Sequence, residues 1–121
     1  MKKKILIIDD DVIYSKILQK ILCGEYTILF AETSDEAINI IQNGEIPDFI
    51  IADLNLPDIH NEDWLITLKE KLGILNKPIM VISGMDDDNI KQQLSEIGIS
   101  EFLIKPIEKQ ILKDKIASLI D

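Results

Sequence analysis

Apolar and polar positions along the chain follow two rhythms that alternate five times. Short continuous apolar runs, such as Ile5–Ile8, are typical of strands buried on both faces of a sheet. Between them, apolar residues recur every three or four positions, as in helices that cover a sheet. The pattern predicts strands at Lys4–Ile8, Tyr26–Ala31, Phe49–Ala52, Ile79–Ser83 and Glu101–Ile104. It predicts helices at Val12–Leu22, Asp35–Gln42, Asp63–Lys71, Asp87–Glu96 and Glu108–Leu119.

Residues with special end preferences support these helix boundaries. Asp11 and Ser34 stand where the first and second helices begin, and both residue types are good N-caps. A glycine, which ends a helix in the left-handed conformation at least cost, follows four of the helices, at Gly24, Gly44, Gly73 and Gly98. The periodicity of the last helix predicts a core face made of Ile107, Ile111, Ile116 and Leu119.

Strict alternation of strand and helix predicts a parallel sheet with helices on both faces and right-handed crossovers. The second and fifth strands are shorter or more polar, as edge strands can be, which favours the spatial order 2-1-3-4-5. The expected fold is therefore α/β, a flavodoxin-like (βα)5 three-layer sandwich. The chain contains no linker, repeat or low-complexity tract, so we expect residues 1–121 to form one domain.

Composition excludes several classes of function. The net charge is −9 and the basic residues are scattered, whereas a nucleic-acid-binding protein usually carries a basic patch. No apolar stretch approaches the roughly 20 residues of a membrane span, and Ile5–Ile8 is too short for an export signal. Cys23 is the only cysteine, which fits a reducing, cytoplasmic compartment, and we expect it to be a small buried hydrophobic residue.

Polar residues stand at four of the strand exits. Asp9 and Asp10 follow the first strand, Asp53 the third, Ser83 ends the fourth, and Lys105 follows the fifth. All exits of a parallel sheet lie on one edge, and ligands bind where the strand order reverses. The sequence therefore predicts three carboxylates, a hydroxyl and an ammonium in one pocket.

Such a cluster needs a compensating cation. Two carboxylates about 5 Å apart repel by roughly 3 kcal/mol at an effective dielectric constant of about 20. Mg²⁺ prefers oxygen ligands and often completes its shell with phosphate oxygens. We therefore expect a Mg²⁺ cofactor.

At these positions the chain resembles the CheY-like receiver family of two-component signalling. The resemblance spans the chain from Ile5 to the last helix. Each motif alone is weak, but together, in order and each at a strand exit, they are specific. They are Ile-Ile-Asp9-Asp10, Asp53-Leu-Asn55-Leu-Pro57, Ser83-Gly84 and Lys105-Pro106.

The resemblance implies how a phosphoryl group and a metal ion would be held. Asp53 would accept the phosphoryl group from a phosphohistidine, on a sensor histidine kinase or a histidine phosphotransfer protein. Asp10, Asp53 and the backbone carbonyl of Asn55 would ligate Mg²⁺ directly, and Asp9 would act through a water. The chain would catalyse only its own phosphorylation and dephosphorylation, so it is not expected to be an enzyme in the usual sense.

The resemblance also implies a switch. Ser83 and Lys105 would bind phosphoryl oxygens, with Lys105 directed by a cis bond to Pro106. Phe102, at the position of the family's switch aromatic, would then change rotamer and alter partner binding. Its lack of a hydroxyl means that coupling to Ser83 must run through packing. A downstream effector or a fused output domain would read the change.

Three alternatives remain. A degenerate receiver would bind partners without phosphorylation, but Asp10, Asp53 and Lys105 are all present. A Mg²⁺-dependent phosphohydrolase usually places its nucleophile after the first strand and needs a longer substrate loop. A flavodoxin-type FMN carrier would need a phosphate-binding first loop, whereas Asp9–Val12 is acidic and would repel a phosphate.

Overall fold

The computed structural model describes the chain at residues 2–53, 78–84, 88–96, 98–99, 101–105 and 107–120. The strands are β1 (Lys3–Ile8), β2 (Tyr26–Ala31), β3 (Phe49–Asp53), β4 (Ile79–Ser83) and β5 (Glu101–Ile104). The helices are α1 (Val12–Leu22), α2 (Ser34–Gln42), α4 (Asp88–Glu96) and α5 (Lys109–Ile120). The predicted helix at Asp63–Lys71, together with Asn55, Pro57, Gly73 and Pro106, lies outside the described residues.

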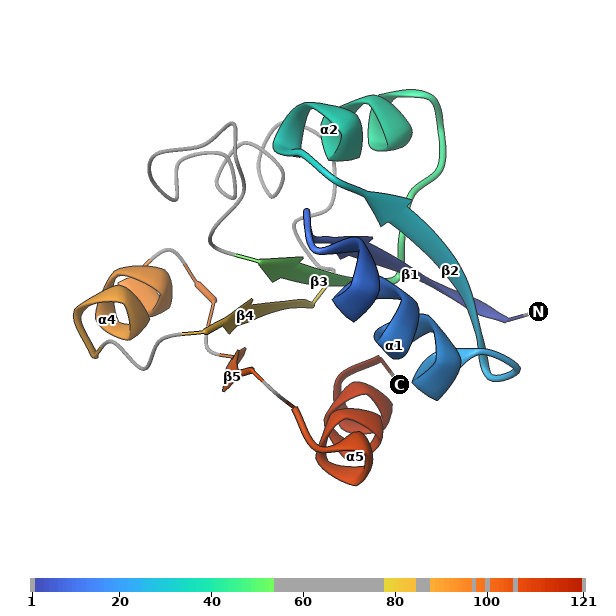
Figure 1. Cartoon of the computed structure of the whole chain (residues 1–121). Coiled ribbons are helices and arrows are strands. Elements are labelled where there is room, and N and C mark those ends of the chain that lie inside the picture. Colours follow the sequence, from blue (N-terminus) through green and yellow to red (C-terminus); the bar gives the residue numbers. More distant parts are fainter. Residues whose placement is uncertain are drawn as a thin grey trace.

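The five strands form one parallel sheet in the order β2-β1-β3-β4-β5, so the predicted order is confirmed. β1 lies between β2 and β3, and the direction in which strands are added reverses beside it. In Figure 1 the arrows of β1, β2 and β3 point the same way, and β2 and β5 lie at the two edges. This order brings the exits of β1 and β3 next to each other.

Each face of the sheet has its own hydrophobic core. Successive side chains of each strand point to opposite faces of the sheet, as the pleat requires. Ile5 and Ile7 of β1 pack with residues of α1 and α5, and Leu6 and Ile8 pack with residues of α2 and α4. Figure 1 shows α1 and α5 as neighbours and α2 and α4 apart from them. β1, β3 and β4 are buried on both faces, as their continuous apolar runs predict.

The first two helices begin with side-chain caps, one of which differs from the prediction. Asp11 caps α1 as predicted, because its carboxylate accepts the backbone N–H of Tyr14 at 3.0 Å. The prediction of Ser34 as the cap of α2 is wrong. Thr33 is extended and its Oγ1 accepts the N–H of Glu36 at 3.1 Å, while Ser34 is already helical and buried.

The core face of α5 also differs in part from the prediction. Ile116 is buried, and Ile107 and Leu119 pack against the same core, as expected. The prediction that Ile111 belongs to the core face is wrong, because half of this residue is exposed, whereas Leu112 is completely buried. Leu112 and Ile116 are one helical turn apart, and the side chain beside them at position 111 is rotated toward solvent.

The segment that follows α1 turns sharply toward β2. Gly24 adopts a φ of 90°, in the left-handed region that glycine tolerates best. Cys23 is exposed, so its prediction as a buried residue is wrong. It leaves the helix as an extended C-cap residue, and its backbone, not its thiol, forms a bridge to Tyr26.

None of the helices in the described part of the chain combines the length and the apolar character that a membrane crossing needs.

Candidate functional site

Backbone pairing places Asp9 and Asp53 side by side. Ile8, the last residue of β1, pairs with Ala52 of β3. Asp9 comes directly after the first of these residues and Asp53 directly after the second. The N–H of Asp9 donates to the carbonyl of Ala31 at 3.0 Å, which continues the pairing of β1 with β2 for one more residue. The two acids are therefore held by the sheet itself.

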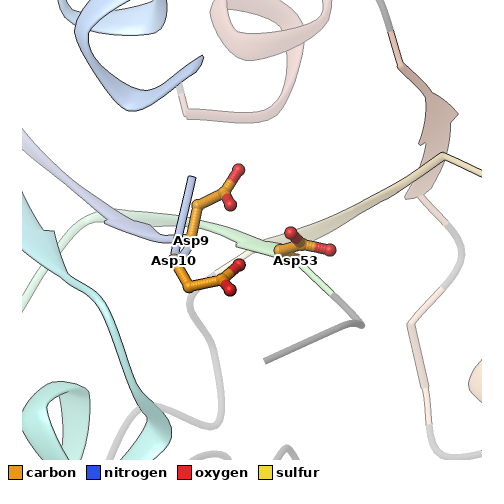
Figure 2. A group of neighbouring side chains, drawn as sticks. All are labelled: Asp9, Asp10 and Asp53. Atoms are coloured by element: carbon orange, nitrogen blue, oxygen red, sulfur yellow. The ribbon is translucent and has the colours of Figure 1, made fainter. Parts of the chain in front are cut away.

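Three carboxylates meet at this edge of the sheet. Oxygen atoms of Asp9, Asp10 and Asp53 all lie within 4.8 Å of one another. Figure 2 shows the first two at the end of β1, with their carboxylates extended toward the side on which Asp53 stands at the end of β3. Asp9 and Asp53 are buried and Asp10 is exposed. The predicted convergence of the acids is confirmed.

Lys105 joins the cluster from the exit of β5. Its Nζ donates to Asp9 Oδ2 at 3.0 Å and to Asp53 Oδ2 at 3.1 Å, so one ammonium bridges two acids. Its backbone N–H donates to the carbonyl of Ser83 at 2.7 Å, which ties the start of the loop to the end of β4. Only a fifth of the lysine side chain is exposed, and both carboxylates are nearly inaccessible. The ion pairs are therefore screened little by solvent.

The negative charge exceeds what Lys105 can neutralise. Burial raises the pKa of the Asp9 carboxyl from 3.8 to about 6, and the neighbouring Asp53 adds to the rise. The N–H of Asp11, which donates to Asp9 at 2.9 Å, and the Lys105 ammonium act in the opposite direction. Burial by itself lowers the pKa of Lys105, but Asp9 and Asp53 outweigh it, so that pKa is raised. The raised pKa of Lys105, and the smaller contribution of Asp53 to that of Asp9, fit a site with more acidic than basic groups.

These donors fit a hard divalent cation. The three carboxylates supply only oxygen ligands, and they come from two adjacent strand exits. Two unit negative charges at this separation repel by roughly 3 kcal/mol at an effective dielectric constant of about 20. A cation among them would relieve that repulsion and favour the ionised form of Asp9. The cluster is thus able to bind a metal ion, and Asn55, the further expected ligand, lies outside the described residues.

The two predicted switch residues lie on neighbouring strands. Ser83 is buried at the end of β4, one residue beyond the Ile82 that pairs with Asp53. Phe102 is half-buried on β5 and packs against the core beneath α2 and α4. The Nζ of Lys91, on α4, lies 5.4 Å from the centre of the Phe102 ring. The ring thus connects β5 to α4 through packing and a cation–π contact.

Sequence reasoning missed one residue beside the site. Tyr14 of α1 lies against Lys105, with 4.7 Å between the lysine Nζ and the ring centre, and its hydroxyl accepts the N–H of Ile107 at 3.2 Å. Its partners lie near the other end of the chain. A tyrosine on the inner face of a helix is ordinarily a core residue, so the sequence held no signal for this contact.

The open parallel sheet of this order, with an acidic cluster and a lysine at its carboxyl edge, has the flavodoxin-like fold of CheY. The family model for the response regulator receiver domain matches residues 5–117. The chain belongs to that family and is a receiver domain of two-component signalling.

Known proteins resemble the chain over nearly its whole length. It is 28% identical to the cell cycle transcriptional regulator CtrA of Caulobacter vibrioides, over 97% of this chain and 50% of that protein. It is 24% identical to the sensor histidine kinase TmoS of Ectopseudomonas mendocina, over 97% of this chain and 12% of that protein. A CheY-like receiver domain protein from Methanospirillum hungatei has the same fold, with a TM-score of 0.90 and 24% identity over 100% of this chain and 95% of that one. The chain thus spans half or less of these two curated relatives.

Proposed function

We propose that this receiver domain accepts a phosphoryl group on Asp53 in a Mg²⁺-dependent reaction, and that the modification switches its binding to a partner protein. The donor would be a phosphohistidine on a sensor histidine kinase or a histidine phosphotransfer protein. The observation that carries the proposal is the bridge from one ammonium to Asp9 and Asp53, beside a third carboxylate. Such an arrangement is suited to bind an anion, the phosphoryl group, and a cation, Mg²⁺, in the same pocket.

Proposed chemistry at Asp53 is an in-line displacement at phosphorus. A carboxylate oxygen of Asp53 forms the new P–O bond while the bond from phosphorus to the histidine nitrogen breaks, and the departing imidazole takes a proton from solvent. The Lys105 ammonium moves from its carboxylates to a phosphoryl oxygen, and the Ser83 hydroxyl donates to another. Ser83 ends β4, the strand next to the acceptor, and Lys105 follows β5, one strand further away, from which its Nζ already reaches Asp53.

Bound Mg²⁺ would supply neutralisation and alignment of the phosphoryl oxygens. We propose that Asp10, Asp53 and the backbone carbonyl of Asn55 hold it directly, and that Asp9 holds it through a water. The exposure of Asp10 supports a direct role, because its carboxylate is accessible to a hydrated ion. The ion pair of Asp9 with Lys105 supports the indirect role of Asp9.

The proposed output is a change of surface and of binding partner. Movement of Ser83 toward the phosphoryl group would free space for Phe102, which couples to Ser83 through packing. Lys91 would follow the ring, so the change would reach the surface formed by α4, β5 and α5. An effector protein or a fused output domain would read that surface. We propose a cytoplasmic location, where kinase donors are phosphorylated, and no direct contact with nucleic acid or membrane.

The test is phosphorylation from a small-molecule donor. We expect acetyl phosphate with Mg²⁺ to add one phosphoryl group, detected by intact mass and mapped to Asp53. Asp53→Asn and chelation of the metal should each abolish the adduct. Asp35→Asn, on the first turn of α2, removes a carboxylate away from the site and should leave it unchanged.

A folded chain that binds Mg²⁺ and never forms the adduct would contradict the proposal and favour a phosphorylation-independent interaction module. Turnover of diverse phosphate esters would instead favour a hydrolase. Beryllofluoride serves as a second probe, because its NMR shifts should centre on Asp53, Ser83 and Lys105 and depend on Mg²⁺.

A further inference from the structure

Tyr14 contacts the connection between β5 and α5 at two points. Its hydroxyl oxygen accepts a hydrogen bond from the backbone N–H of Ile107 at 3.2 Å. The Nζ of Lys105 lies 4.7 Å from the centre of its ring, within cation–π distance. One side chain of α1 thus holds residues on both sides of position 106.

The ring itself is fixed relative to the acidic cluster. The N–H of Tyr14 donates to Asp11 Oδ1 at 3.0 Å, and the N–H of Asp11 donates to Asp9 Oδ1 at 2.9 Å. These bonds tie the first turn of α1 to the end of β1. Tyr14 is half-buried and packs against the core shared by α1 and α5. Its ring therefore has a defined place beside the pocket.

Lys105 is a residue that needs such support. A lysine ends in a compact charge on a flexible stem of four methylenes, and ordering that stem is entropically unfavourable. In the structure two carboxylates order the ammonium. During phosphoryl transfer the ammonium must leave them for a phosphoryl oxygen, whereas the face of the ring can attract it throughout the move.

We propose that Tyr14 is a positioning residue that directs the Lys105 ammonium into the pocket, a role that rests on the proposed function of Asp53. The aromatic face guides the ammonium, and the hydroxyl fixes the backbone at Ile107. The competing explanation is packing alone. Tyr26, at the start of β2, packs against the same core and provides a matched control for the loss of an aromatic side chain.

The test compares three variants in the full chain. Tyr14→Leu removes the ring and the hydroxyl, Tyr14→Phe removes only the hydroxyl, and Tyr26→Leu removes a ring of the same core. NMR first reports the geometry: a ring current should shift the ε-methylene protons of Lys105 upfield in the wild type and in Tyr14→Phe, and the shift should disappear in Tyr14→Leu. Both Tyr14 variants should accelerate hydrogen exchange at the Ile107 amide.

The second readout is the maximal rate of Asp53 phosphorylation at saturating acetyl phosphate. We expect Tyr14→Leu to be about tenfold slower and Tyr14→Phe less than about threefold slower, because most of the cation–π attraction survives in phenylalanine. The affinity for Mg²⁺, measured by NMR titration, should not change. Tyr26→Leu should match the wild type in both.

The outcomes separate the two proposals. An unchanged Lys105 resonance in Tyr14→Leu, a wild-type rate in that variant, or an equal slowing in Tyr26→Leu would each overturn the role of Tyr14. A wild-type chain that accepts no phosphoryl group would instead overturn the function of Asp53. In that case the Lys105 resonances still decide whether Tyr14 positions the ammonium.

Discussion

At the scale of single residues, the site is an unequal balance of charges. Asp9 is buried, its pKa is raised to about 6 by that burial, and it shares one lysine with Asp53. The folded protein keeps these acids clustered although the repulsion among them opposes folding. Stability that is given up at one cluster of polar residues is a common mark of a functional site.

The raised pKa predicts how stability depends on pH in metal-free protein. Because the folded pKa of Asp9 lies above its ordinary value of 3.8, protonation of Asp9 favours the folded state. This contribution is fully present below 3.8 and is lost as pH rises through about 6. A rise of this size corresponds to at most about 3 kcal/mol.

Asp9→Asn isolates that contribution. In EDTA, its stability advantage over the wild type, measured by urea unfolding, should grow as pH rises from about 4 to about 7. Asp114→Asn, an exposed carboxylate on α5, should show no such growth. A constant difference between Asp9→Asn and the wild type across this range would contradict the prediction.

At the scale of elements, strand exits and helix starts do most of the positioning. β1 ends at Ile8, Asp9 and Asp10 follow it, and Asp11 already caps α1. The same short connection therefore supplies two acids of the site and starts the helix that carries Tyr14. A change in the cap should therefore alter both the stability of the protein and the geometry of the connection between β1 and α1.

The cap of α1 can be tested with a pair of variants. Asp11→Ala should lower the free energy of unfolding by about 1 kcal/mol, because the N–H of Tyr14 loses its acceptor. Asp11→Asn removes the same charge but keeps a capping oxygen, so it should be close to the wild type. Equal losses in the two variants, measured by urea unfolding, would attribute the effect to charge and not to the cap.

At the scale of the whole molecule, two cores hold the sheet from opposite faces. The core shared by α1 and α5 contains the fully buried Leu112, whereas its neighbour Ile111 is half exposed. Since adjacent residues on one helix have such different environments, they provide a matched test of which face of α5 is anchored.

Leu112→Ala should destabilise the chain by about 2–5 kcal/mol, because it removes buried methyl groups and leaves a cavity. Ile111→Ala should change the free energy of unfolding by less than about 0.5 kcal/mol. Both are read from the midpoint of urea unfolding at constant slope. A larger loss at Ile111 than at Leu112 would mean that α5 packs with a different face.

Much of this architecture was predictable from sequence because its causes are local or periodic. Continuous apolar runs identified the central strands, and the alternation of strand and helix implied a parallel sheet. The shorter or more polar second and fifth strands favoured the order that the structure has. Asp9, Asp10, Asp53 and Lys105 were expected in one pocket because parallel strands deliver their exits to one edge.

Tertiary structure alone decided what depends on contacts between distant segments or on small rotations. Whether Thr33 or Ser34 caps α2 depends on a single backbone conformation, and whether Ile111 or Leu112 faces the core depends on the rotation of α5 against the sheet. The contacts of Tyr14 with Lys105 and Ile107 join the first helix to the last connection. Sequence periodicity therefore determined the sheet and the place of the acids and the lysine, whereas only the packing of α1 against the connection between β5 and α5 determined that Tyr14 lies beside that lysine.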